Sequence, residues 1–369
     1  MPRMIPLADS AAAHSELATE LEAAALRILR SGRYILGPEV AAFEEELADW
    51  VGVKNAIGVA SGTDALLLSL AALNLPKGSK VVTTPFTFFS TVSCIVRLGY
   101  EPLFVDIDPI SLNLDIQKTA KACRDKAVRA VIGVDVYGDP LDYTALRKAM
   151  GRSEVRLIED AAQSFGAELD GKRAGTLADA AIFSFFPAKN LGAAGDGGAV
   201  VTDDDELAER IRVLRVHGSK PKYFHHLVGY NSRLDPLQAA LLRVKLQHME
   251  STLQRRTTIA KRYATGLAGV VEVPLPLMGH RHAWNYYTIM TERRDELAAY
   301  LKEQGVGSAI YYPRPLHLQP CFSYLGYGAG SFPEAEVACE RVLALPMYPQ
   351  LTPENQYTVI AAIRSFFGK

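Results

Sequence analysis

A single lysine, Lys189, stands between an aromatic run and a cluster of glycines in FSFFPAKNLGAAGDGG, residues 183–198. Lysine is usually a solvated surface residue, and a surface lysine in a mobile loop explains Lys189 if it stands alone. An apolar environment would instead disfavour the ammonium form and lower the lysine pKa. The amine would then be a nucleophile that can form a Schiff base with a carbonyl group.

A pair of carboxylates ends a predicted buried strand in IEDAAQ, residues 158–163. Because ligands of open α/β sheets bind at the carboxyl ends of the strands, Asp160 would face such a crevice. A buried carboxylate needs a partner, and a protonated heterocyclic nitrogen is one candidate. The alternative is that Asp160 only caps the helix that follows.

A small-residue turn opens a predicted helix in SGTDAL, residues 61–66. The first N–H groups of a helix lack partners within the helix, and they lie at its positive end, so such a turn can hold an anion. The alternative is that Ser61 or Thr63 is a simple N-cap.

A fourth candidate, GYNSRLD at residues 229–235, precedes a long helical pattern and supplies the amide of Asn231 and the guanidinium of Arg233. Arg233 can bind a carboxylate or phosphate through paired hydrogen bonds, although a local salt bridge is the alternative. Taken together, the four segments supply an anion cradle, an acid for a ring nitrogen and a Schiff-base lysine. These are the parts that a pyridoxal phosphate site needs.

The bulk composition excludes several other classes. The chain has 369 residues, 49% of them hydrophobic and 22% charged, and a formal net charge of -1, so nothing favours nucleic acid or a membrane as partner. Its four cysteines are far apart, so neither a disulfide framework nor a metal site is expected. It shows neither a signal peptide nor an apolar run long enough to span a bilayer, so we expect a cytoplasmic protein.

Short β-rich runs alternate with helical stretches from about residue 50 to residue 201, which predicts an α/β fold with a mostly parallel sheet covered by helices. Asp170-Gly171 predicts a hairpin turn. One long helix, residues 236–267, is expected to connect two domains. We expect a large domain over residues 1–250, including an N-terminal arm, and a smaller α+β domain over residues 251–369.

At this point the sequence resembles the pyridoxal phosphate-dependent sugar aminotransferases of the DegT/DnrJ/StrS family. The resemblance spans nearly the whole chain, with motifs that include ASGTDAL, IEDAAQSFGA, FSFFPAKNLGAAGDGG, YNSRLDPLQAALLRVKL and YYPRPLHLQPCF. It implies a fold-type I architecture, with a doubly wound large domain and a smaller C-terminal domain. It also implies a homodimer with active sites at the subunit interface.

The resemblance assigns roles by motif. Lys189 corresponds to the Schiff-base lysine, Asp160 to the acid that pairs with the pyridine nitrogen, and Gln163 to an amide near the cofactor's ring oxygen. Further cofactor contacts are implied for Gly62, Thr63 and Ser184 at the phosphate, Phe86 stacked on the ring, and Asn231 reaching the phosphate from the neighbouring subunit. Residues in segments that border the sugar or amino-donor site are His217, Arg233, Tyr311 and His317.

Two positions depart from the family pattern, and one feature decides the reaction. Asp135 stands where a histidine is common, which leaves the contacts there open, and Asp196 replaces a usual glutamate. Family members that act as dehydratases carry histidine in place of the lysine, so Lys189 favours amino transfer.

The resemblance therefore implies an aminotransferase (EC 2.6.1) that uses L-glutamate to aminate a nucleotide-linked keto-sugar, in the biosynthesis of amino sugars for surface polysaccharide (lipopolysaccharide) or glycosylated metabolites. The wording of residues 217–235 favours the C3 position of a UDP- or dTDP-linked 3-keto-sugar. C4 amination, a keto-cyclitol substrate and a non-catalytic regulatory protein with the same fold remain alternatives, and the state of the sugar's C6 is open.

Overall fold

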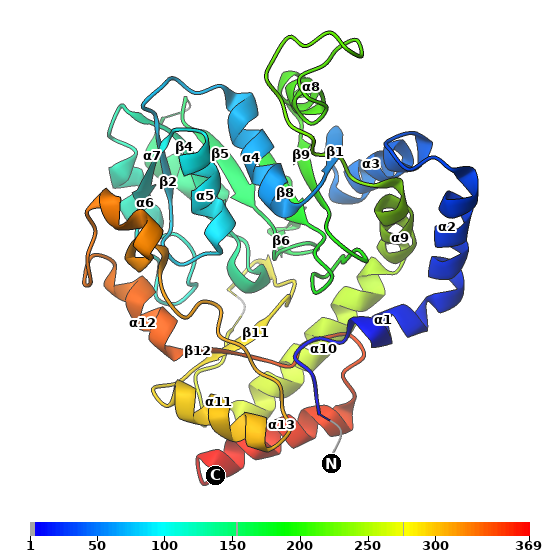
Figure 1. The fold of residues 1–369 in the computed structure, drawn as a ribbon. Coiled ribbons are helices and arrows are strands. Elements are labelled where there is room, and N and C mark those ends of the chain that lie inside the picture. Colours follow the sequence, from blue (N-terminus) through cyan, green and yellow to red (C-terminus); the bar gives the residue numbers. More distant parts are fainter. Residues whose placement is uncertain (1–3, 153, 276) are drawn as a thin grey trace.

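A seven-stranded sheet forms the centre of the larger part of the molecule (Figure 1). The computed structural model describes residues 4–152, 154–275 and 277–369. The strands lie in the order β1-β9-β8-β5-β4-β2-β3, and β9 is antiparallel to both of its neighbours. They are β1 (Asn55–Val59), β2 (Lys80–Thr83), β3 (Glu101–Phe104), β4 (Val128–Val134), β5 (Arg156–Asp160), β8 (Ala180–Ser184) and β9 (Gly198–Thr202). The predicted mostly parallel α/β sheet is confirmed.

Helices cover both faces of this sheet. One face carries α4 (Gly62–Leu73), α5 (Phe89–Arg97) and α8 (Asp205–Leu214). The other carries α3 (Pro38–Val51), α6 (Ile116–Ala122), α7 (Tyr143–Met150) and α9 (Pro236–Gln247). Outside α9 lies α2 (Ala18–Ser31), which follows α1 (Ser10–Glu16).

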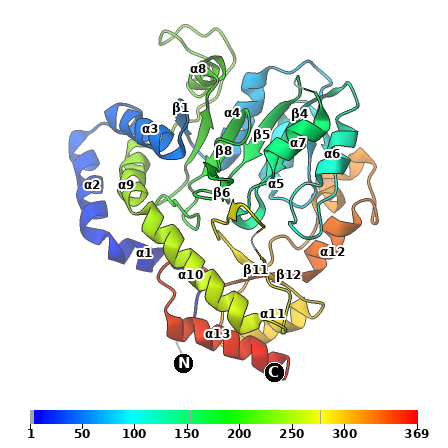
Figure 2. The same cartoon turned by 180° about the vertical axis from the view of Figure 1, so that it is seen from behind.

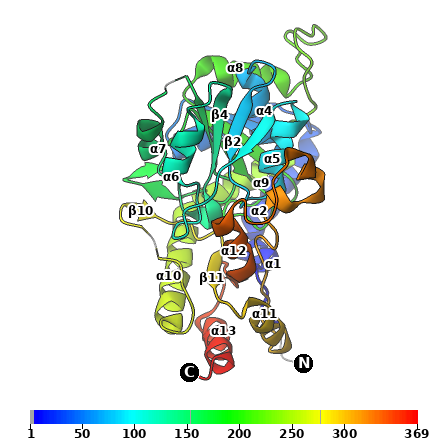
Figure 3. The same ribbon diagram turned by 90° about the vertical axis from the view of Figure 1, so that its left-hand side faces the viewer.

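The smaller part of the molecule is built on a two-stranded antiparallel sheet, β11 (Tyr287–Met290) with β12 (Val342–Leu345). Its helices are α10 (Met249–Leu267), α11 (Arg294–Glu303), α12 (Pro333–Arg341) and α13 (Pro353–Phe366). Figure 3 shows α10, α11 and α13 at the end of the molecule opposite α8. Ile5 joins this part through backbone hydrogen bonds to Gly305 and Gly307, each 2.8 Å long, so the start of the chain packs here as well.

The long helix expected between the two parts is in fact two helices, so that prediction is wrong. The backbone of His248 has φ -100° and ψ 8°, outside the helical region, and this separates α9 from α10. The break changes the direction of the chain. As a result α9 stays against α2 and α3, while α10 packs against α13 (Figure 2).

The predicted turn at Asp170-Gly171 is confirmed. It joins β6 (Glu168–Leu169) to β7 (Lys172–Arg173), and β10 (His280–Arg281) pairs with β6. Both turn residues have positive φ, 49° at Asp170 and 76° at Gly171, as a tight hairpin turn requires.

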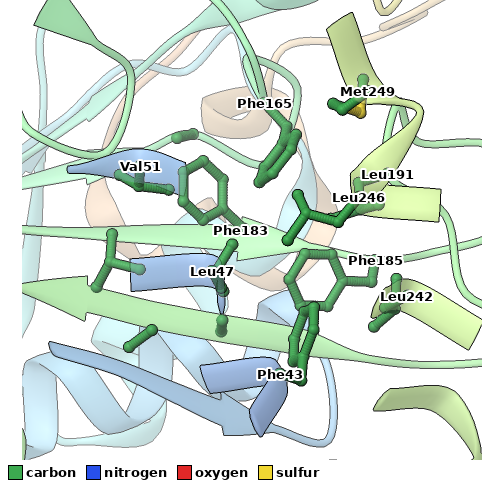
Figure 4. Close-up of a cluster of buried hydrophobic side chains, with 14 of the residues drawn as sticks. Phe43, Leu47, Val51, Phe165, Phe183, Phe185, Leu191, Leu242, Leu246 and Met249 are labelled. Carbon is green, nitrogen blue, oxygen red and sulfur yellow. The ribbon is translucent and has the colours of Figure 1, made fainter. Parts of the chain in front are cut away.

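Successive side chains of β8 and the residue after it point alternately into the hydrophobic core and toward a cavity on the other face. Phe183 and Phe185 point into the core between the sheet and α3 and α9, where their rings pack on Phe165 and Phe43 with centroids 4.9 and 5.5 Å apart (Figure 4). Because successive side chains of a strand point to opposite faces, Ser184 lies on the other side, where it lines a cavity. The aromatic run thus fixes the strand that presents Ser184 and, after it, Lys189.

Replacing Phe183 by alanine tests this anchoring. Because Phe183 is completely buried, the Phe183→Ala protein should lose about 3–5 kcal/mol of unfolding free energy, measured by urea denaturation. The control is Tyr324→Ala, since Tyr324 is 64% exposed. Equal, small losses in both variants would contradict the assignment of Phe183 to the core.

Candidate active site

A cavity of about 400 Å³ lies where the carboxyl ends of β5 and β8 meet the N-terminus of α4. Its remaining wall comes from the segment before α5 and from tyrosines of the smaller part. The side chains around it include Ser61, Gly62, Thr63, Thr87, Phe88, Asp160, Gln163, Ser184, Phe186, Lys189, Asp196, Tyr286, Tyr311 and Tyr312. Segments far apart in the sequence therefore meet at one edge of the sheet.

Lys189 lies in a tight turn after β8. Its backbone N–H donates to the carbonyl of Phe186 at 2.8 Å, and the amide of Asn190 holds the turn by donating to the carbonyl of Ala283 at 2.8 Å. The amine lies 5.9 Å from the ring centroid of Tyr286. Desolvation by burial lowers the pKa of Lys189 to about 8, and the charge of Asp160 opposes part of that shift. Near neutral pH the uncharged, nucleophilic fraction of Lys189 is therefore much larger than that of an ordinary lysine.

Asp160 ends β5 and is almost fully buried, with 5% exposure. One carboxylate oxygen accepts from the hydroxyl of Thr91 at 2.9 Å, and the other accepts from the N–H of Ala162 at 3.3 Å. Burial raises the pKa of Asp160, while both hydrogen bonds and the Lys189 charge act in the opposite direction. A cationic partner on the cavity side would stabilise the ionised carboxylate.

The N-terminus of α4 lies directly against β8. Ser61 is the N-cap, and its hydroxyl accepts a backbone N–H of the first turn at 3.1 Å. A Cβ at Gly62 would lie 2.7 Å from the Cβ of Ser184, so only glycine allows this approach. The Ser184 hydroxyl, the side chain of Thr63 and the positive end of the helix therefore line the same part of the cavity. This is a suitable cradle for a phosphate.

Gln163 connects the turn after β5 to the tyrosine wall. Its side-chain oxygen accepts from the backbone N–H of Tyr137 at 2.8 Å, and its amide donates to the hydroxyl of Tyr312 at 2.9 Å. The Tyr137 hydroxyl in turn donates to the backbone carbonyl of Tyr311. These bonds hold residues 311–312 over the cavity.

Phe86, which the family resemblance placed on the cofactor ring, does not line the cavity. It is completely buried, and its ring packs edge-on against Tyr137 and Tyr312 at 6.3 and 6.1 Å. Phe88, two residues further along, lines the cavity instead. In an extended chain the side chains of Phe86 and Phe88 lie on the same side, so the motif alone does not show which of them lines the cavity. The turn that leads into α5 determines this.

Of the remaining site candidates, Tyr311 lines the cavity and the others do not. Asn231 and Arg233 line an adjoining hollow of about 550 Å³ that shares Ser61 and Asp196 with the main cavity. His217 is exposed, and its carbonyl accepts from His225 at 2.9 Å.

His317 is buried away from the cavity. Its Nε2 hydrogen-bonds to Glu336 at 3.1 Å, and its ring packs against Phe332. These contacts within one chain give His317 a structural role. The family motif implied that His317 borders the sugar or amino-donor site, but in the structure His317 does not line the cavity.

Sequence reasoning missed Thr91, Tyr286 and Tyr312. Thr91 lies within an otherwise ordinary helix, and only the folded structure brings its hydroxyl to Asp160. Tyr312 belongs to the motif YYPRPLHLQPCF, but its contact with Gln163 spans 149 positions and leaves no local signal. Among the described residues, no cluster of His, Cys, Asp or Glu suits a metal ion, and no helix is long and apolar enough to cross a membrane.

Pyridoxal phosphate fits the residues around this cavity. Gly62 leaves room for its phosphate at the start of α4, Asp160 offers a buried carboxylate to its ring nitrogen, and the half-buried Lys189 offers an amine of lowered pKa to its aldehyde. The seven-stranded sheet with this cavity at its carboxyl edge defines a pyridoxal phosphate enzyme of fold-type I.

The chain belongs to the DegT/DnrJ/EryC1/StrS aminotransferase family, whose model matches residues 15–364. It is therefore an aminotransferase with pyridoxal phosphate as cofactor. A crystal structure of DesV from S. venezuelae, in complex with a ketimine intermediate, has 41% identity and a TM-score of 0.96, covering 100% of this chain and 99% of the other.

Three curated relatives align with 98% of this chain. The pleiotropic regulatory protein of Geobacillus stearothermophilus is 44% identical over 98% of its length. The dTDP-3-amino-3,4,6-trideoxy-alpha-D-glucose transaminase of Streptomyces venezuelae is 42% identical over 96% of its length. The UDP-N-acetyl-3-dehydro-alpha-D-glucosamine 3-aminotransferase of Acidithiobacillus ferrooxidans is 39% identical over 97% of its length.

Replacing Thr91 by valine tests its support of Asp160. The Thr91→Val protein keeps the shape of the side chain but loses a hydrogen bond to a charged group, so the pKa of Asp160 should rise further. Affinity for pyridoxal phosphate, titrated by absorbance, should then fall about tenfold. Thr91→Ser keeps the hydroxyl and should bind close to the wild-type level. Equal affinities in the two variants would contradict a role for this hydrogen bond.

Proposed function

We propose that this chain transfers the amino group of L-glutamate to the C3 keto carbon of a nucleotide-linked sugar. The observation that carries the proposal is the half-buried Lys189, with its lowered pKa, in the same cavity as Asp160. The regiochemistry is supported by the relatives, since a dTDP-linked and a UDP-linked 3-amino or 3-keto sugar appear in the names of two of them. The product would serve the biosynthesis of amino sugars for surface polysaccharide or glycosylated metabolites, in the cytoplasm.

Each wall of the cavity has a proposed task toward the cofactor. The start of α4, with Gly62, Thr63 and Ser184, would hold the phosphate. Asp160 would keep the ring nitrogen protonated, and Gln163 would lie at the ring oxygen. We propose Phe88, in place of Phe86, as the aromatic ring that stacks on the cofactor.

Bound pyridoxal phosphate supplies an aldehyde that accepts an amine and an electron-withdrawing ring that lets a proton leave the neighbouring carbon. The chain's own contribution to the reaction is proton transfer. Lys189 Nζ would take the proton from the α-carbon of the amino donor. It would later deliver a proton to the sugar carbon that receives the amino group. A pKa of about 8 suits this work because the amine is poised between its two forms near neutral pH.

The tyrosine wall would orient substrates and exclude water. The rings of Tyr286 and Tyr311 pack with centroids 4.4 Å apart, and Gln163 holds the neighbouring Tyr312. Sugar or amino-donor contacts are proposed for Tyr311, Arg233 and His217. Within one chain His317 lies too deep for that role, so we do not propose it.

We propose a homodimer in which Asn231 reaches the cofactor phosphate of the neighbouring subunit. Asn231 is exposed and lies in the hollow next to Ser61, not in the cavity of its own chain. The loop after α8 projects from the body (Figure 1), and it exposes large apolar side chains such as Val228, which is 97% exposed. Such side chains support burial against another subunit.

We also propose that the two parts are a large domain, residues 1–250, and a small domain, residues 251–369. The boundary falls at the start of α10, which leaves the sheet layer to pack against α13. The bond between Ile5 and Gly305 implies that the N-terminal arm associates with the small domain.

Replacing Lys189 by alanine tests the proposed catalytic group. The Lys189→Ala protein should form amino-sugar product at least about a thousandfold more slowly, measured by mass spectrometry, because it lacks the group that moves the proton. Lys172→Ala, on the exposed hairpin, is the matched control and should be unaffected. Turnover by Lys189→Ala close to the wild-type rate would refute the assignment.

A substrate panel tests the proposed chemistry. Given L-glutamate, the enzyme should aminate dTDP- or UDP-linked 3-keto-sugars and release 2-oxoglutarate, with at least about tenfold preference over 4-keto isomers, since a misplaced carbonyl loses its alignment with Lys189. Exclusive amination of 4-keto-sugars or of a keto-cyclitol would refute C3 specificity.

A regulatory role is the second candidate function, because the 44% identical relative is named a pleiotropic regulatory protein. Cofactor binding without turnover of any substrate would favour that role.

Mixing two inactive proteins tests the shared site. Neither Lys189→Ala nor Asn231→Ala homodimers should be active alone, but mixed dimers contain one intact site if Asn231 acts across the interface. Refolding the two together should restore about a quarter of wild-type activity. If both residues served the site of their own chain, mixing would restore nothing.

A further inference from the structure

Two buried carboxyl groups lie behind the cavity, and none of the roles proposed above uses them. Asp135 follows β4 directly, and Glu159 is the residue before Asp160 in β5, on the opposite face of the sheet. Both side chains are completely buried. The oxygens of Glu159 accept from the backbone N–H groups of Gly175 at 2.8 Å and Leu177 at 3.2 Å.

The two carboxyl groups hydrogen-bond to each other. An ionised carboxylate only accepts hydrogen bonds, so a bond between two such groups requires that one of them carries a proton. In the part of the chain that the structure describes, neither residue has a lysine, arginine or histidine as ion-pair partner. The ionisable group that faces the pair is Tyr143 from α7, which supplies no positive charge, and Asp160 points to the opposite face of the sheet.

The surroundings indicate which residue holds the proton. Asp135 accepts hydrogen bonds from the N–H of Leu141 and the hydroxyl of Tyr143, both at 3.0 Å, and from the hydroxyl of Ser164 at 2.7 Å. Among the described residues, Glu159 accepts hydrogen bonds from two backbone N–H groups and, apart from its bond with Asp135, from no further donor. Hydrogen bonds to a carboxylate favour its charged form, so the charge belongs on Asp135 and the proton on Glu159. Burial raises the pKa of both residues, and the charge of Asp135 raises that of Glu159 further.

This pair connects two segments that carry site residues. The N–H of Asp135 donates to the carbonyl of Asp160 at 3.2 Å, and its carboxylate holds Ser164, which follows Gln163. Two residues after Asp135, the N–H of Tyr137 donates to Gln163. A movement at Asp135 would therefore displace both Asp160 and Gln163.

We propose that Asp135 and Glu159 share one proton in the folded protein and that the protonated pair positions Asp160 and Gln163 for the cofactor. The positioning half of this inference rests on the proposed function, while the shared proton does not.

The shared proton has a spectroscopic signature. Wild-type protein at neutral pH should show the infrared carbonyl band of a buried, protonated carboxylic acid. The Asp135→Asn and Glu159→Gln proteins should lack the band, because each keeps one charge and a hydrogen bond between the two side chains without a titrating proton. An Asp160→Asn background removes from the spectrum the neighbouring carboxyl group whose pKa is also raised by burial. A band that persists in both variants would overturn the shared proton.

The same proton should appear in the pH dependence of stability. Unfolded carboxyl groups release their protons near pH 4, whereas the folded pair retains one, so stability falls as pH rises from about 4 through the raised pKa of the pair. As pH rises from about 5, thermal midpoints of Asp135→Asn and Glu159→Gln should fall less steeply than that of the wild type. Parallel curves in all three proteins would refute the inference.

The positioning role is tested by removing the hydrogen bond between Ser164 and Asp135 while keeping Asp135 and Glu159 in place. The Ser164→Ala protein should keep the infrared band but bind pyridoxal phosphate about fivefold more weakly, the effect of one lost hydrogen bond. Ser164→Thr keeps the hydroxyl and should restore much of the affinity if it folds with the same stability. Unchanged affinity in Ser164→Ala would overturn the positioning role. If the enzyme aminated no sugar, the infrared and stability results would stand, so the two failures are distinguishable.

Discussion

The rest of the site depends on the electrostatic relation between Lys189 and Asp160, which line one cavity. Burial disfavours the charged form of both groups: it lowers the pKa of the amine, which is about 8 with the Asp160 charge in place, and raises that of the carboxylic acid. Each group opposes this effect in the other, because its charge stabilises the partner's charged form. The amine is therefore reactive near neutral pH, and the acid is ready to pair with a positive ring nitrogen.

The fold serves this relation by bringing distant segments to one edge of a sheet. Phe183 and Phe185 fix β8 in the core, so that Ser184 and the turn with Lys189 face the cavity. The absence of a side chain at Gly62 lets the positive end of α4 approach β8 closely. A second level of contacts, from Thr91 to Asp160 and from Asp135 to Ser164, then holds the reactive groups in place.

The sequence predicts the sheet and its helices well, because apolar strands alternate with helical patterns and each element carries a local signal. It also indicates the Lys189 and Asp160 segments by the scarcity of charged residues in apolar runs. What it does not predict depends on tertiary packing. The break at His248 separates two helices that pack on different neighbours, and the turn before α5 places Phe88, not Phe86, on the cavity wall. The contacts of Thr91 and Glu159 likewise have no local signal.

The most direct measurement of the central claim is the pKa of Lys189 in cofactor-free protein, obtained from the pH dependence of its acylation, with the modified site identified by mass spectrometry. The wild-type protein should titrate at about 8. In Asp160→Asn the pKa should be lower still, because the carboxylate that favours the ammonium form has gone. A lysine that titrates near its ordinary value, or one whose pKa does not fall in Asp160→Asn, would contradict the account.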